Sequence, residues 1–138
     1  MTTIATDGKV LVGDGLSTSN GLICSTDNVK VHRIGSELVG CAGLQDTTLA
    51  YLKWLRKKGP KPLGVEDNFN AVHVSSKGVF LICGNNLSKI EVTPPFAIGS
   101  GADHAIGAMA AGATPRQAVV IVSKLTTSTG GKITELKL

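Results

Sequence analysis

The chain opens with the sequence TTIATDGKVLVGDG at residues 2–15, and this stretch decides the fold class. The pair Asp7-Gly8 stands between two segments with alternating apolar residues, and Asp-Gly in that setting is the usual signal of a two-residue β-hairpin turn. We therefore expect strands over Thr2–Ala5 and Val10–Gly13, joined as the first hairpin of an antiparallel sheet.

Working outward from this hairpin, further reversals punctuate the chain. Asn20-Gly21 indicates a second reversal, and Gly35-Ser36 and Ser76-Lys77-Gly78 indicate two more. The strands predicted on either side of these turns and beyond them are Val29–Ile34, Glu37–Cys41, Phe69–Ser75, Val79–Cys83, Lys89–Val92 and Lys132–Leu138.

Three helices are expected between the strands. From Asp46 the apolar spacing changes to three and four residues and ends in the basic run 56–60, which predicts an amphipathic helix. A second helix is predicted over Ala102–Ala111. A third begins at Thr114-Pro115-Arg116-Gln117 and ends near Lys124, because this start has the residues of a capping box with proline in the first turn.

The resulting order of strands, helix, strands, two helices and strand predicts an α+β fold with antiparallel sheets covered by alanine-rich helices. Two sheets packed face to face between outer helices would give a four-layer αββα sandwich. Periodicity alone equally allows a two-layer α+β fold.

Composition narrows the class of protein. The 138 residues, of which 42% are hydrophobic, form a single domain over residues 1–138. Five aromatic residues leave little to stack on bases, so no nucleic acid partner is expected despite the net charge of +4. The apolar runs are too short to cross a membrane and no secretory signal opens the chain, so cytoplasmic residence is the default expectation.

No metal or cofactor is expected either. Cys24, Cys41 and Cys83 are widely spaced among apolar neighbours and are interpreted as small core residues. His32 and His73 lie in strand patterns, where a structural role is the more frequent one.

The start of the chain suggests a catalytic nucleophile. Removal of Met1 is favoured because the next residue is small, and Thr2 would then carry a free α-amino group beside its hydroxyl. Since an α-amino group titrates near pH 8, it can accept the hydroxyl proton near neutral pH. Three other polar residues are candidates for the same site: Asp14 in a tight turn, Lys30 in a strand and Ser100 between two glycines. Gly40 is a candidate backbone N–H donor to an oxyanion.

Seven segments in this order carry a family resemblance: Thr2-Thr3-Ile4, Gly13-Asp14-Gly15, Val29-Lys30-Val31-His32-Arg33, Gly40-Cys41-Ala42-Gly43 followed by Asp46, Ala97-Ile98-Gly99-Ser100-Gly101, Ala108-Met109-Ala110-Ala111-Gly112-Ala113, and Ser128-Thr129-Gly130-Gly131. Over nearly its full length the chain resembles the N-terminal-nucleophile threonine peptidases of the proteasome β-type and HslV family. The resemblance implies the αββα sandwich, with two antiparallel sheets between helix layers.

It also implies a role for each candidate residue. Thr2 would be the nucleophile and its amine the general base, Lys30 would tune their pKa values, and Asp14 would orient Lys30. Gly40 N–H would form the oxyanion hole, and Ser100 would join the hydrogen bonds around the amine. The chain would cleave a peptide or unfolded protein substrate inside a self-associated ring, with a possible ATPase unfoldase partner.

One departure from the family pattern stands at Thr126, where many proteasome β subunits carry aspartate. Two other functions therefore stay open: a catalytically silent assembly subunit of the same kind of ring, and an N-terminal-nucleophile amidohydrolase of a small amide.

Overall fold

The structure is a computed structural model that describes residues 2–138. Within that range the elements follow in the order β1 (Thr3–Thr6), β2 (Val10–Gly13), β3 (Ser17–Ser19), β4 (Leu22–Ser25), β5 (Val31–Ile34), β6 (Glu37–Ala42), α1 (Gln45–Leu55), β7 (Asn70–Ser75), β8 (Gly78–Cys83), β9 (Ser88–Val92), β10 (Phe96–Gly99), α2 (Ala102–Ala110), α3 (Pro115–Leu125) and β11 (Thr134–Lys137).

The first hairpin forms as an antiparallel pair, but its turn is longer than the predicted two residues. Thr6 still pairs with Leu11, so β1 ends one residue later than expected. The Asp7 carboxylate accepts hydrogen bonds from the backbone N–H groups of Lys9 at 2.9 Å and Val10 at 3.0 Å. These bonds close a three-residue turn around Gly8.

The strands build a four-stranded sheet in the order β10-β1-β2-β11 and a five-stranded sheet in the order β5-β6-β7-β8-β9. The five-stranded sheet pairs only neighbours in sequence, whereas β1 gains its second partner from β10, far along the chain. The strand β10 is not evident from the sequence, because it directly follows Pro94-Pro95 and ends at Gly99, and proline and glycine usually indicate a loop.

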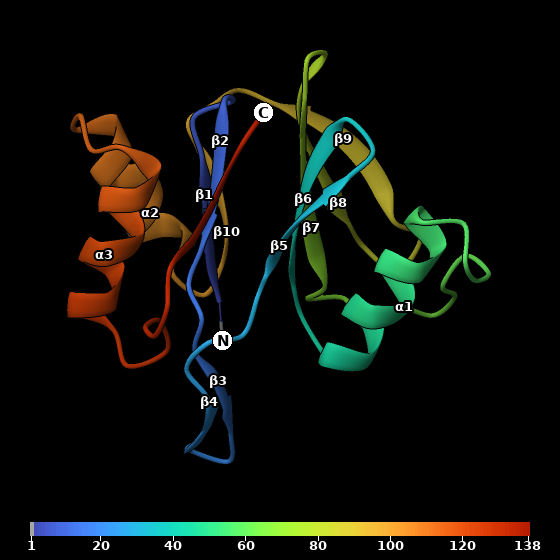
Figure 1. Cartoon of the computed structure of the whole chain (residues 1–138), viewed down its shortest axis with the longest axis horizontal. Helices are drawn as coiled ribbons and strands as arrows, with labels where there is room; N and C mark the ends of the chain where they lie inside the picture. The colour runs from blue at the N-terminus through green and yellow to red at the C-terminus, as the bar shows by residue number, and fades with distance from the viewer. Residues whose placement is uncertain (1) are drawn as a thin grey trace.

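Three apolar clusters hold these parts together. One cluster lies between the two large sheets and includes Ile4, Leu11 and Val72. A second joins the five-stranded sheet to α1 around Tyr51 and Phe69. The third is rich in alanine and valine and joins the four-stranded sheet to α2 and α3. Figure 1 shows α2 and α3 beside β1 and β2, and α1 beside the other sheet.

The prediction of a four-layer αββα sandwich with two antiparallel sheets between helix layers is wrong. The described residues form three antiparallel sheets, because β3 and β4 pair only with each other and project from the body as a separate ribbon. They also form only three helices, and α1 stands alone on the five-stranded sheet. The segment after α1 contains glycine and proline, so it adds no second helix there.

Two smaller expectations had different outcomes. Cys41 is buried as predicted, but Cys24 is exposed on β4 because that strand belongs to the projecting ribbon. The capping box of α3 is confirmed, since Gln117 N–H donates to the Thr114 hydroxyl and Thr114 N–H donates to the Gln117 amide oxygen. No helix within residues 2–138 is long and apolar enough to span a membrane.

Candidate active site

Asp14 and Lys30 form a buried ion pair at the end of the first hairpin. The Lys30 Nζ lies 2.9 Å from Asp14 Oδ1, and the side chains are 6% and 0% exposed. Asp14 also accepts backbone N–H bonds from Thr3 at 3.0 Å, Leu16 at 3.3 Å and Gly130 at 3.2 Å. Because four donors surround it, the carboxylate is held in one orientation and holds Lys30 in turn.

The Lys30 ammonium is positioned by a second oxygen, since its Nζ donates to the Leu16 carbonyl at 2.7 Å. Burial lowers the pKa of Lys30, and the charge and hydrogen bond of Asp14 oppose that effect. The side chain ends in a cavity, so a buried positive charge faces the space where Thr2 lies.

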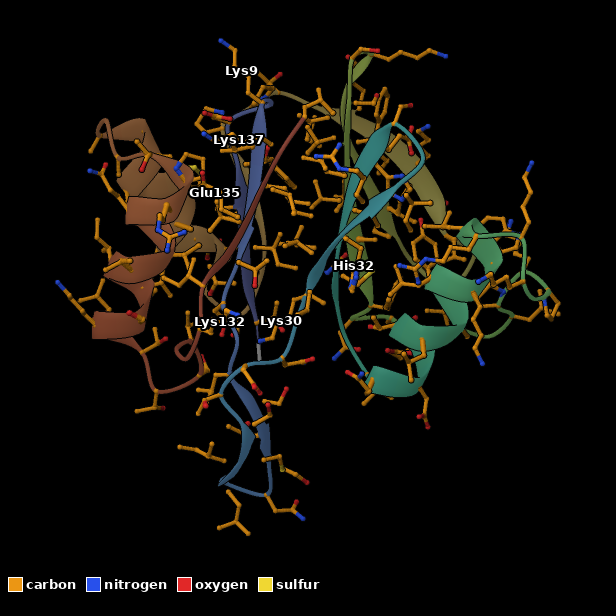
Figure 2. The ribbon with its side chains drawn as sticks, in the orientation of Figure 1. Lys9, Lys30, His32, Lys132, Glu135 and Lys137 are labelled. Carbon is orange, nitrogen blue, oxygen red and sulfur yellow. The ribbon has the colours of Figure 1, made fainter. Side chains whose placement is uncertain are left out.

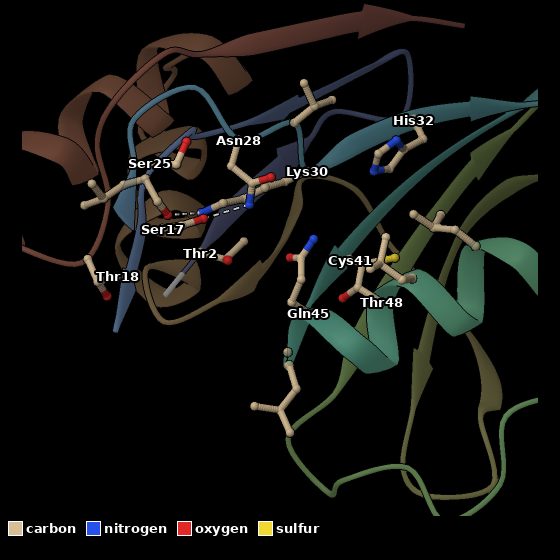
Figure 3. A pocket seen from close by; sticks show the side chains of 16 residues that line it. Thr2, Ser17, Thr18, Ser25, Asn28, Lys30, His32, Cys41, Gln45 and Thr48 are labelled. Carbon is tan, nitrogen blue, oxygen red and sulfur yellow. Dashed lines mark hydrogen bonds between the residues drawn. The ribbon is translucent and has the colours of Figure 1, made fainter. Parts of the chain in front are cut away.

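Lys30 and Thr2 both line a cavity of about 560 Å³. Figure 3 shows Thr2 and Lys30 on one wall and Gln45, Thr48, Cys41 and His32 on the other. The lining residues are Thr2, Leu16, Ser17, Thr18, Ser25, Asn28, Val29, Lys30, His32, Cys41, Gly43, Leu44, Gln45, Thr48, Leu49 and Leu52. The site thus combines the β3–β4 ribbon, the start of β5, the end of β6 and one face of α1.

Ser100 anchors Thr2 through the backbone. Its hydroxyl donates to the Thr2 carbonyl at 3.4 Å, and Gly101 N–H reaches the same oxygen at 3.4 Å. At Gly99 a Cβ would lie 2.0 Å from the Thr2 carbonyl oxygen, so only glycine allows β10 to come this close.

A chain of hydroxyl groups continues from Ser100. Its Oγ lies 3.2 Å from Ser128 Oγ, and Ser128 Oγ lies 3.5 Å from Thr126 Oγ1. Thr126 Oγ1 donates to the Val122 carbonyl at 3.3 Å, at the end of α3. The position that departs from the family pattern is therefore linked to Thr2 through neutral hydroxyl groups.

The structure does not bring Gly40 to the cavity. It lies inside β6, where it pairs with Val31 on one side and Val72 on the other, and a Cβ on it would meet Ile4 in the core. Gly43, three residues later, lines the cavity instead. Gly40 lies within β6, whereas Gly43 follows its last residue, Ala42, one residue beyond the predicted end of this strand.

The sequence did not identify the other residues that line the cavity, because they come from elements that lie apart in the sequence. Ser17, Thr18 and Ser25 come from the ribbon, and Asn28 donates to the Ser17 hydroxyl at 2.8 Å. His32 was expected to be structural, yet it lines the cavity. The signal in the sequence was the two-residue spacing of Lys30 and His32, which places both side chains on the same face of a strand.

Within residues 2–138 no group of three or more His, Cys, Asp and Glu side chains is arranged to hold a metal ion.

Comparisons with known proteins show the fold. No protein-family model and no curated protein matches this chain. Among solved structures, Thiobacillus denitrificans BPH matches with a TM-score of 0.78 and 19% identity, over 99% of this chain and 96% of that chain. Thiobacillus denitrificans BPH in complex with epoxomicin matches with a TM-score of 0.76 and 18% identity, over 99% and 97%. At this level of identity, the chain shares the fold of that protein.

Proposed function

We propose that this chain is a threonine peptidase whose nucleophile is Thr2, made N-terminal by removal of Met1. Met1 lies outside the described residues. The observation that carries the proposal is that Thr2 and Lys30 line one cavity while buried Asp14 holds Lys30. The fold shared with a protein solved in complex with epoxomicin, a proteasome inhibitor, supports it.

The proposed reaction has two steps. The Thr2 hydroxyl oxygen attacks the carbonyl carbon of the peptide bond while the Thr2 amine takes the hydroxyl proton. The C–N bond breaks, the proton passes to the departing amine, and an ester remains on Thr2. Water then attacks the carbonyl carbon of the ester, its proton passes through the same amine to the Thr2 oxygen as the ester C–O bond breaks, and the free acid leaves.

Lys30 favours this chemistry through its charge. A buried ammonium beside Thr2 lowers the pKa of a neighbouring amine and hydroxyl, because protonating the amine next to it costs energy and ionising the hydroxyl next to it gains energy. Gly43, which lines the cavity, is the glycine to which we assign the N–H donor for the oxyanion, in place of Gly40.

Cys41 is the thiol among the residues that line the cavity, and it fits the reaction poorly. Burial raises the pKa of its thiol to about 12, although the charge of Arg56 opposes the rise. A thiol with this pKa is almost wholly protonated near pH 7, so it is a weak nucleophile.

The test is a mass and activity measurement on the purified chain. We expect Thr2 at the N-terminus, hydrolysis of fluorogenic peptides, and a mass increase of one epoxomicin molecule. Thr2→Ser should keep part of the activity, because it keeps a hydroxyl beside the amine. Thr2→Ala should abolish both hydrolysis and epoxomicin addition.

The matched control is Thr127→Ala, because Thr127 is exposed and does not line the cavity. It should leave both readouts unchanged. Retained Met1 or an active Thr2→Ala variant would overturn the proposal. An inactive chain that still assembles would favour the silent subunit, and hydrolysis of small amides but not of peptides would favour the amidohydrolase.

A further inference from the structure

We infer that the cavity beside Thr2 accepts an acidic side chain of the substrate, on the acyl side of the cleaved bond, and that His32 selects it. This inference rests on the proposed peptidase function, since it names the substrate class of the same site. It concerns the wall of the cavity opposite Thr2, where His32 lies near Cys41 and Thr48 (Figure 3).

The backbone of β5 directs His32 into the cavity. Lys30, Val31 and His32 alternate between two faces, and Val31 is 1% exposed in the core between the sheets. Lys30 and His32 therefore share the opposite face and both line the cavity. Figure 2 labels both residues, Lys30 just before β5 and His32 within it.

The wall of the cavity is mixed, since exposed Gln45 is polar whereas buried Leu16 and Leu52 are apolar. Val29, Leu44 and Leu49 line the cavity and are 51%, 64% and 48% exposed. Farther in, His32 is half-buried and Cys41 is buried. A substrate side chain in this cavity contacts aliphatic groups and can reach His32, which suits the methylenes and terminal carboxylate of Glu or Asp.

Apart from the Cys41 thiol, the charged or titratable side chains that line the cavity are basic, although Asp14 pairs with Lys30 and Glu66 accepts from the Leu44 N–H just behind the lining. The residues that line it include Lys30 and His32 but no Asp or Glu. Arg56 at the end of α1 acts on both His32 and Cys41 through its charge. Asp14 does not line the cavity and already has four donors. A carboxylate is thus attracted, and a Lys or Arg side chain is repelled.

His32 has unused hydrogen-bonding capacity. Burial and the charge of Arg56 act on the His32 ring but no hydrogen bond from residues 2–138 does, although the ring is half-buried. An apolar substrate side chain would leave the imidazole covered and unpaired, which is unfavourable. A carboxylate would accept its N–H and would stabilise the protonated ring.

The protonation of His32 adds a second readout. Burial, followed by the charge of Arg56, lowers the pKa of His32 in the unoccupied cavity. The charged or titratable groups that face it are Lys30 from its own segment, Cys41 from β6 and Arg56 from α1. A carboxylate bound beside the imidazole stabilises its protonated form and so raises the pKa of His32. None of the three groups named is anionic, so none already supplies this effect. The preference for an acidic substrate should therefore increase as the pH falls from 7.5 to 6.

The experiment compares four fluorogenic peptide amides that differ only in the last acyl residue: Glu, Gln, Leu and Lys. We expect kcat/KM for Glu to exceed that for Gln by about tenfold, which corresponds to about 1.4 kcal/mol. His32→Leu should remove most of this difference and its pH dependence, and should improve the Leu substrate. His104→Leu is the matched control, because His104 is exposed on α2 and does not line the cavity.

Each other result has a separate meaning. A wild-type preference for Leu or Lys overturns the inference and leaves the proposed function intact. A preference for Glu that survives His32→Leu overturns the role of His32. No hydrolysis of any peptide, by protein shown to begin at Thr2, overturns the proposed function and this inference with it.

Discussion

At Gly99 the backbone of β10 passes so close to the carbonyl of Thr2 that no side chain fits between them. The residue also has a φ of +95°, which side chains rarely adopt. Gly112 offers a comparison, because its φ is +112° but nothing lies within 4 Å of its Cβ position. A comparison of substitutions at Gly99 and Gly112 therefore separates the energetic cost of backbone strain from the cost of the contact with Thr2.

We predict that Gly112→Ala lowers the free energy of unfolding by about 1–2 kcal/mol, the cost of the left-handed conformation alone. Gly99→Ala should cost more than twice as much and should displace Thr2. Urea unfolding and peptide hydrolysis measure the two effects. Equal losses for both variants would show that the contact with the Thr2 carbonyl carries no energy.

The ion pair of Asp14 and Lys30 gives a second prediction at the residue scale. Lys30→Met leaves a fully buried carboxylate without its countercharge, and such a loss costs about 3–5 kcal/mol. The double variant Asp14→Asn with Lys30→Met should be more stable than Lys30→Met alone, because it removes the uncompensated charge. If unfolding in urea shows additive losses, the two side chains are not coupled.

At the scale of elements, α1 depends on a distant residue for its start. Its N-cap residue is Leu44, whose side chain cannot accept a hydrogen bond from the backbone N–H groups of the first turn. Glu66 instead accepts from the Leu44 N–H at 2.9 Å and the Thr47 hydroxyl at 2.6 Å. Burial alone would raise the pKa of Glu66, but these hydrogen bonds together outweigh it and lower the pKa.

We expect Glu66→Gln to lower the free energy of unfolding by about 1 kcal/mol at pH 7, the usual value of a helix cap. Because the pKa of Glu66 is lowered, its contribution is present above the ordinary value of 4.5 and is lost as the pH falls through the folded-state pKa. The difference between variant and wild type should therefore shrink in acid. Asp67→Asn, at the exposed next residue, should show no such difference.

His73 joins α1 to the sheet beneath it. Its Nε2 lies 2.7 Å from the Tyr51 hydroxyl, and its Nδ1 lies 3.1 Å from the Glu37 carboxylate. Burial lowers the pKa of His73, although the hydrogen bond and charge of Glu37 oppose the shift. The unfolded chain then binds this proton more readily than the folded chain does.

Stability should consequently be greatest above the ordinary histidine value of 6.5 and decrease as the pH falls from there through the folded-state pKa. His73→Gln should be less stable at pH 7.5 but should lose less stability between pH 7.5 and 5.5 than wild type does. Thermal unfolding at the two pH values measures this. An equal loss in both proteins would contradict the assignment to His73.

At the scale of the whole molecule, the ribbon of β3 and β4 leaves large apolar side chains in solvent. Leu22 is 72% exposed and Ile23 is 66% exposed, on a two-stranded sheet whose outer edges are unpaired in the described chain. Exposed apolar groups of this kind favour association. We propose this ribbon as the surface through which copies of the chain associate.

We predict that replacing both Leu22 and Ile23 with Ser reduces the native mass toward that of one chain, without loss of folding. Light scattering measures the mass and circular dichroism the fold. Replacing exposed Leu63 with Ser is the matched control, since Leu63 is 88% exposed in the loop after α1. An unchanged mass in the double variant would place the contact elsewhere.

Local interactions made a large part of this structure predictable. The strand at Val10–Gly13, the helix that follows Leu44 and the capping box at Thr114 all depend on residues near one another in sequence. The strand at Phe96–Gly99 was missed because only its pairing with β1 makes it a strand. The four-layer prediction failed for a similar reason, since strand pairing decided that β3 and β4 form a third sheet.

The same division holds for the site. Periodicity and turn residues act locally, so the sequence was enough to predict the hairpins and the helices. It was also enough to single out Thr2, Asp14, Lys30 and Ser100 as candidate site residues. Only the tertiary structure decided that Gly43 rather than Gly40 lines the cavity and that His32 faces it. The reason is physical: a cavity is formed by elements that meet in space, and which side chains line it depends on the register and packing of strands far apart in the chain.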